Sequence, residues 1–163
     1  MALIDAQNKH IDEDIVDVQL APRKKRFRFN GDNNRILELD TSDFSIIKRL
    51  NKIYPKLTKL TQEAVNMIPD DNEDTPVEES IAAMSDALTD IDNKMRAYLD
   101  ELFDANVSEV CAPTGSMYDP FAGKFRFEHI IETLSSLYEN NMSKEFAAMR
   151  ERVQKHTDKY TRK

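Results

Sequence analysis

The fold is decided by two stretches, SDFSIIKRLNKIYPKLTKLTQEAVNM (residues 42–67) and TPVEESIAAMSDALTDIDNKMRAYLDELFD (residues 75–104). In each stretch the main apolar residues recur at alternating steps of three and four. The first set is Ile46, Leu50, Ile53, Leu57, Leu60, Ala64 and Met67, and the second is Ile81, Met84, Leu88, Ile91, Met95, Tyr98 and Leu102. This spacing places each set on one narrow stripe of a helix. A short acidic loop joins the stretches, which predicts an antiparallel helix pair.

The two predicted helices carry opposite charge, which favours their pairing. Residues Thr41–Val65 sum to +3, and residues Asn66–Glu109 sum to −11. Exposed ion pairs contribute roughly a few tenths of a kcal/mol each, so the apolar stripes supply most of the stability. Leu88→Asp places a charge in the stripe and is expected to unfold the protein. The alternatives are that both stripes are ordinary core faces of one helical domain, or that the pair is a coiled-coil arm that binds a partner.

Composition narrows the class of protein. A chain of 163 residues is long enough for one domain with a core. The net charge of −7 argues against general binding of nucleic acid or anionic membranes, and three glycines nearly exclude a Gly-rich nucleotide-binding loop. No apolar run approaches the roughly 20 residues of a membrane span, and residues 1–17 lack the pattern of a secretion signal. We therefore expect a cytoplasmic protein without membrane contact.

A small β-hairpin is predicted over residues 25–40. Phe27 and Phe29 alternate with arginines, the NGDNN segment supplies turn residues, and Leu37 and Leu39 alternate with polar residues. The fold class is therefore mainly α (α+β), with a central antiparallel helix pair, C-terminal helices and a small N-terminal β-hairpin.

One helical domain is expected over residues 15–155, between a flexible N-terminus at 1–14 and a basic tail at 156–163. Its helices are predicted at about 43–67, 76–104, 126–140 and 143–155. The first contains Pro55, which predicts a kink or two separate helices, and Asn140 and Asn141 predict the last break. The final helix would turn Phe146, Met149 and Val153 inward.

Two further local signals concern residues outside the long helices. Val16, Val18 and Leu20 alternate with polar residues and give a short strand signal. The acidic segment Asp12–Asp17 could also pair beside the basic strand as a third strand of the hairpin. Thr75, followed three residues later by Glu78, forms a capping box at the start of the second helix.

We expect no catalytic, cofactor or metal site. His10, His129 and His156 lack metal-ligand spacing, and the single cysteine, Cys111, has no second thiolate beside it. Cys111 and His129 could form a nucleophile and its base. A cysteine packed in a loop and a histidine on the polar side of a helix explain both residues more simply.

Two surfaces are candidates for binding a partner. The first is a long loop with large apolar residues, which either tuck under the domain or contact a partner; they are Met117, Tyr118, Phe121, Phe125 and Phe127. The second is a basic patch that could contact phosphates while Phe27 and Phe29 stack on bases; it comprises Arg23, Lys24, Lys25, Arg26 and Arg28. The alternative for the patch is a hairpin whose phenylalanines face the core while its arginines meet water.

The layout of the chain resembles a known family. RILELDTSDFSIIKRLNKIYPKL at 35–57, LDELFD at 99–104, GKFRFEHIIETLSSLYE at 123–139 and the basic MRERVQKHTDKYTRK at 149–163 look like tail assembly chaperone-like proteins of long-tailed phages and prophages of Gram-positive bacteria. The resemblance implies a non-enzymatic, self-associating protein without cofactors that acts in the bacterial host cytoplasm. It would coat the tape measure protein and help recruit tail tube subunits. The alternatives are a structural tail or head component of the virion, and a nucleic-acid-binding regulator that uses residues 23–29.

Overall fold

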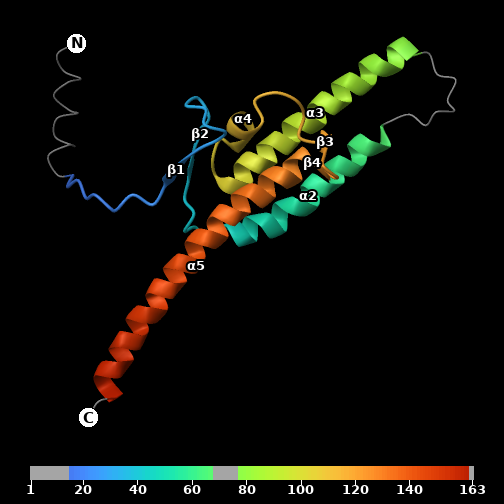
Figure 1. Cartoon of the computed structure of the whole chain (residues 1–163). Helices are drawn as coiled ribbons and strands as arrows, with labels where there is room; N and C mark the ends of the chain where they lie inside the picture. Colours follow the sequence, from blue (N-terminus) through green and yellow to red (C-terminus); the bar gives the residue numbers. More distant parts are fainter. Residues whose placement is uncertain (1–14, 68–76, 162–163) are drawn as a thin grey trace, which may run out of the picture.

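The predicted helix pair is present as α2 (Ile46–Asn66) and α3 (Val77–Phe103), which pack side by side (Figure 1). The computed structural model describes residues 15–67 and 77–161. All seven stripe residues of the first helix are buried or half-buried. The proposed capping residue Thr75 and the N-terminal segment 1–14, which was predicted to be flexible, lie outside the described residues.

The buried face of α3 is wider than the predicted stripe and is shifted toward the end of the helix. Ile91, Met95 and Leu102 are buried as expected, whereas Leu88 is half-buried and Ile81 is 52% exposed. Two residues outside the stripe, Leu99 and Phe103, are also buried, because α3 contacts α4 as well as α2.

Residue Pro55 does not divide α2 into two helices. A proline in a helix leaves the carbonyl four residues earlier without its hydrogen-bond donor. Here both Pro55 and Asn51 lie on the exposed side of α2, so water can reach the carbonyl of Asn51. The helix therefore tolerates the proline.

The N-terminal β-hairpin is confirmed. Strands β1 (Lys25–Arg28) and β2 (Ile36–Leu39) are antiparallel, with Phe27 opposite Leu37. Leu37 and Leu39 are buried, so one face of β2 joins the core.

The suggested third strand at residues 12–17 does not form over its described residues 15–17, and residues 12–14 lie outside the described ranges. The segment at residues 15–20, which carries the strand signal, is likewise not a strand. Its apolar residues Ile15, Val16, Val18 and Leu20 are 60–88% exposed. A segment this short forms a strand only when it pairs, and Pro22 interrupts the chain just before β1.

The C-terminal helix α5 (Arg126–Thr161) is one continuous helix of 36 residues, so the predicted break at Asn140 and Asn141 is wrong. Asparagine costs a helix only about 0.7 kcal/mol or less. Asn141 also accepts a hydrogen bond on Oδ1 from Lys25 Nζ at 2.5 Å. The helix continues through most of the predicted basic tail, and residues 162–163 lie outside the described ranges.

Only the first half of α5 packs against the helix pair. The ring centroid of Phe127 lies 6.5 Å from that of Tyr54 on α2, and the ring centroid of Tyr138 lies 6.0 Å from that of Phe103 on α3. The second half extends past the other elements (Figure 1). The expectation that Phe146, Met149 and Val153 face inward is therefore wrong, because these side chains are 38–65% exposed.

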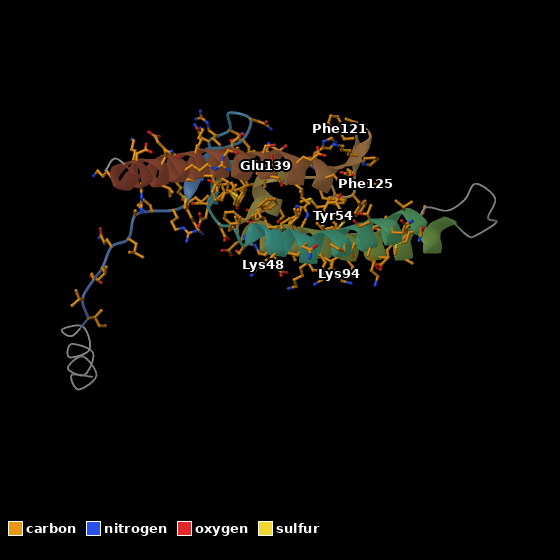
Figure 2. All side chains as sticks on the ribbon, turned by 90° about the horizontal axis from the view of Figure 1, so that it is seen from below. Lys48, Tyr54, Lys94, Phe121, Phe125 and Glu139 are labelled. Carbon is orange, nitrogen blue, oxygen red and sulfur yellow. The ribbon has the colours of Figure 1, made fainter. Side chains whose placement is uncertain are left out.

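The segment between α3 and α5 contains the short helix α4 (Val107–Cys111) and a second antiparallel hairpin, β3 (Pro120–Phe121) with β4 (Lys124–Phe125). Figure 2 places Phe121 and Phe125 beside α5, on the opposite side of the molecule from Lys48 and Lys94. No helix in the described ranges is both long and apolar enough to cross a membrane.

A polar stripe on α3 holds this segment in place. Asp92, Arg96 and Asp100 are spaced four residues apart, so they lie on one face of the helix. Asp100 accepts hydrogen bonds from the backbone N–H of Ser108 at 2.7 Å and from its hydroxyl at 2.8 Å. Asp92 accepts one from the backbone N–H of Met117 at 2.6 Å.

Arg96 completes the stripe by contacting both α3 and the segment between α3 and β3. Its Nε lies 2.7 Å from Asp92 Oδ2. Its remaining nitrogens donate to three backbone carbonyls, of Ala112 at 2.8 Å, Gly115 at 2.6 Å and Ser108 at 3.2 Å. The segment that leads to β3 is therefore positioned by side chains of α3.

Candidate binding groove

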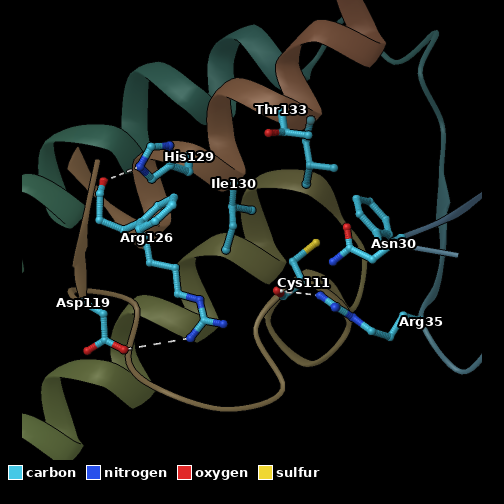
Figure 3. A pocket seen from close by; sticks show the side chains of 11 residues that line it. Asn30, Arg35, Cys111, Asp119, Arg126, His129, Ile130 and Thr133 are labelled. Carbon is cyan, nitrogen blue, oxygen red and sulfur yellow. Dashed lines mark hydrogen bonds and ion pairs between the residues drawn. The ribbon is translucent and has the colours of Figure 1, made fainter. Parts of the chain in front are cut away.

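A groove of about 520 Å³ opens between the first hairpin, α4, the second hairpin and α5 (Figure 3). Its lining combines apolar and polar side chains, as binding sites usually do. The lining residues are Phe29, Asn30, Arg35, Cys111, Asp119, Phe121, Arg126, His129, Ile130, Thr133 and Leu134.

Two arginines form the polar wall of the groove. Arg35 donates from Nε to the carbonyl of Val110 at 2.8 Å and from a terminal nitrogen to the carbonyl of Cys111 at 3.0 Å. Arg126 donates to the carbonyl of Thr114 and lies 4.0 Å from Asp119. Backbone carbonyls between α3 and α5 hold both guanidinium groups, so this wall is preorganised. Figure 3 shows the contacts of Arg35 with Cys111 and of Arg126 with Asp119.

Phe121 forms the exposed edge of the groove, with 72% of its surface accessible. His129 Nε2 hydrogen-bonds the carbonyl of Phe121 at 2.6 Å, and the two ring centroids are 5.4 Å apart. The turn after Phe121 has positive φ at Ala122 (49°) and Gly123 (77°), as the tightest hairpin turns require. This turn and His129 hold the phenyl ring at the mouth of the groove.

The predicted apolar loop is mostly tucked into the core. Met117 is 0% exposed and Phe127 is 2% exposed, so neither is available to a partner in this conformation. Tyr118 and Phe125 are half-buried, and the Tyr118 hydroxyl lies 3.3 Å from the carbonyl of Leu88. Of the five predicted partner-binding residues, Phe121 alone is largely exposed.

The predicted basic patch is exposed, but most of its charges have partners within the chain. Arg23 lies 3.1 Å from Asp40, and Arg26 lies 3.7 Å from Glu38. Lys25 and Arg28 donate hydrogen bonds to asparagine side chains, and Lys24 has no such partner among the described residues. The neighbouring carboxylates reduce the positive potential that a nucleic-acid interface needs.

Cys111 and His129, considered from the sequence as a nucleophile and its base, both line the groove. Burial is the main cause that raises the pKa of the Cys111 thiol, to about 11. His129 Nε2 is occupied by the Phe121 carbonyl. A thiol with this pKa stays protonated near neutral pH, which argues against a nucleophile.

The raised pKa of Cys111 predicts a loss of stability at alkaline pH. The unfolded thiol ionises near pH 9, whereas the folded thiol ionises near pH 11, so its contribution is present below pH 9 and lost as the pH rises through 11. We expect Cys111→Ala to show a shallower alkaline decline than the wild type in urea unfolding. The comparison is needed because Tyr138, with its pKa raised by burial to about 12, also destabilises the fold at high pH. Identical declines in both proteins would contradict the assignment.

Gly115 packs against the polar wall of the groove, and Gly115→Ala is expected to lower the free energy of unfolding by about 2 kcal/mol. Gly115 has φ +78°, and a Cβ there would collide with Arg126 and lie 2.7 Å from Asp119 Oδ2. Gly31→Ala is the matched control, because Gly31 has φ +69° and no atom within 4 Å of its Cβ position. Chemical denaturation should show a smaller loss, about 1 kcal/mol, for the control. Equal losses of unfolding free energy in the two variants would mean that Arg126 and Asp119 move away from the new Cβ without a measurable cost.

The sequence did not indicate the polar residues of this wall. Arg35, Asp119 and Arg126 come from three separate segments, and none belongs to a recognisable motif. Within residues 15–67 and 77–161, no group of three or more His, Cys, Asp or Glu residues is placed to hold a metal ion.

The fold defines a mainly α protein, and the groove defines a candidate binding surface. Comparisons of the chain with models of protein families, with curated proteins and with solved structures found no significant match. The resemblance to tail assembly chaperones therefore stays a prediction.

Proposed function

We propose that this protein is a non-enzymatic phage assembly protein, most specifically a tail assembly chaperone that binds the tape measure protein and tail tube subunits. The observation that carries the proposal is the groove with Phe121 at its mouth. Large aromatic residues beside a pocket are the usual anchors of protein–protein contacts, and Phe121 is 72% exposed.

The chemistry of the groove suits an amphipathic segment of another protein. Phe121 and the half-buried Phe29 supply apolar surface, while Ile130 and Leu134 line the groove as buried residues of α5. Arg35, Asp119 and Arg126 supply polar groups of both signs near the same opening. A helix with one apolar stripe and flanking charges can satisfy both kinds of contact, as in other helix-in-groove complexes.

The proposal is tested by co-expression with the long, predicted-helical protein encoded beside this chain in the bacterial host. We expect the partner to become soluble and to co-purify with many copies of this chain. If the partner precipitates and does not co-purify with the wild type, the chaperone proposal is wrong. Detection of the chain in purified particles would instead indicate a structural virion component.

The contribution of the groove is tested by Phe121→Ser. We expect recovery of the partner to fall at least about tenfold, because Phe121 is the proposed anchor. Ile81→Ser is the matched control, since Ile81 is 52% exposed on α3 and does not line the groove. Both variants should keep the wild-type helicity by circular dichroism. An equal effect of both substitutions would place the partner's binding site elsewhere.

A further inference from the structure

The second half of α5 carries an apolar stripe on a helix that projects from the rest of the molecule (Figure 1). Met142, Phe146, Met149 and Val153 follow one another at steps of four, three and four. Met142 is half-buried, whereas Phe146 and Met149 are 38% and 59% exposed. The spacing is that of a coiled-coil seam, in which the apolar side chains of two helices interlock.

An aromatic contact extends this apolar stripe to Phe44, which lies just before the start of α2. Phe44 packs edge to face against Phe146, with ring centroids 5.4 Å apart, and remains 54% exposed. The apolar surface is therefore widest where α5 leaves the domain. Most of the stability of a helix in a protein comes from packing its apolar face against another element.

The charges beside the stripe are self-complementary. Glu145 and Arg150 occupy the positions that flank a coiled-coil seam, and neither makes an ion pair within the described residues. In contrast, Glu151 and Lys155 lie on the outer face and pair with each other at 3.0 Å. In a parallel pair of α5 helices, Glu145 of each copy faces Arg150 of the other; in an antiparallel pair with matched apolar layers, it faces Arg152.

From these three observations we propose that two copies of this chain dimerise through the second half of α5, with the Met142–Val153 stripe as the seam and Glu145 paired to an arginine of the other copy. This surface is separate from the groove, so the inference does not depend on the proposed function. The seam is short, and a dissociation constant on the order of micromolar is expected for the pair.

The test is sedimentation equilibrium of the purified full chain over about 1–200 µM, a range that spans the expected constant. We expect a monomer–dimer equilibrium in the wild type. Met149→Lys should raise the dissociation constant at least about tenfold, because it places a charge in each half of the seam. Ala148→Lys, which adds the same charge on the exposed outer face, should leave it within about twofold. Because Met149 is exposed, both variants should keep the melting temperature of the wild-type monomer.

A charge exchange tests the pairing and gives its direction. Glu145→Arg should weaken the dimer, and adding one of the two substitutions Arg150→Glu and Arg152→Glu, but not the other, should restore it. Rescue by the first would make the helices parallel, and rescue by the second would make them antiparallel. A wild-type chain that stays monomeric throughout the range would overturn the proposal, as would a dimer that Met149→Lys leaves intact. The assay contains no partner protein, so its failure would leave the groove proposal standing.

Discussion

Arg96→Ala is expected to lower the free energy of unfolding by about 3–4 kcal/mol, among the largest effects of any polar substitution in this protein. The guanidinium group lies 2.7 Å from the carboxylate of Asp92, and the two side chains are 21% and 15% exposed. It also donates to the carbonyls of Ser108, Ala112 and Gly115. Its removal leaves a half-buried carboxylate without its cation and takes this donor from the carbonyls of Ala112 and Gly115, while the carbonyl of Ser108 still accepts from the backbone N–H of Ala112 at 3.1 Å.

The matched control for Arg96 is Lys94→Ala on the same helix. Lys94 makes the same kind of pair with a residue four positions earlier, at 2.7 Å from Asp90, but both side chains are more than half exposed. An exposed pair contributes little because water and salt screen it, so urea denaturation should show no measurable change. Arg96→Lys keeps the charge but loses the planar donors, and its stability should lie between the two. If Arg96→Ala is no more harmful than Lys94→Ala, the α4 segment is held by other contacts.

Leu99→Asp is expected to abolish folding, and Leu99→Ala to cost about 3 kcal/mol. Leu99 lies on α3 and is 0% exposed, in the core of the protein. Truncation to alanine leaves a cavity, and an aspartate would bring an unpaired charge into an apolar interior. Far-ultraviolet circular dichroism and chemical denaturation measure the two effects.

The same substitutions at Leu88 distinguish the burial seen in the structure from the burial that the sequence pattern predicts. The regular stripe includes Leu88 and omits Leu99, and it predicts that Leu88→Asp unfolds the protein. The structure leaves Leu88 half-buried, so Leu88→Ala should cost clearly less than Leu99→Ala. A larger loss at Leu88 would show that the regular stripe describes the seam better than the observed burial does.

The helix pair and the first hairpin could be predicted from the sequence alone, because both depend on patterns that are local in the chain. Apolar residues at steps of three and four make one face of a helix whatever the rest of the chain does. The NGDNN turn likewise sets up the antiparallel pairing of Phe27 with Leu37. The sequence also identified the loop with Phe121 as a candidate partner-binding surface.

Which apolar residues are buried and which polar residues meet depends on contacts between segments that are distant in the sequence. Met117 and Phe121 look alike as large apolar loop residues, yet one fills the core and the other stands at the mouth of the groove. The difference arises because Asp92 binds the backbone of Met117 across 25 positions in sequence, a contact that no local pattern encodes. The second half of α5 is another case in which the sequence pattern does not determine burial. Its stripe has core-like spacing, but the helix pair ends before reaching it, so the stripe stays exposed.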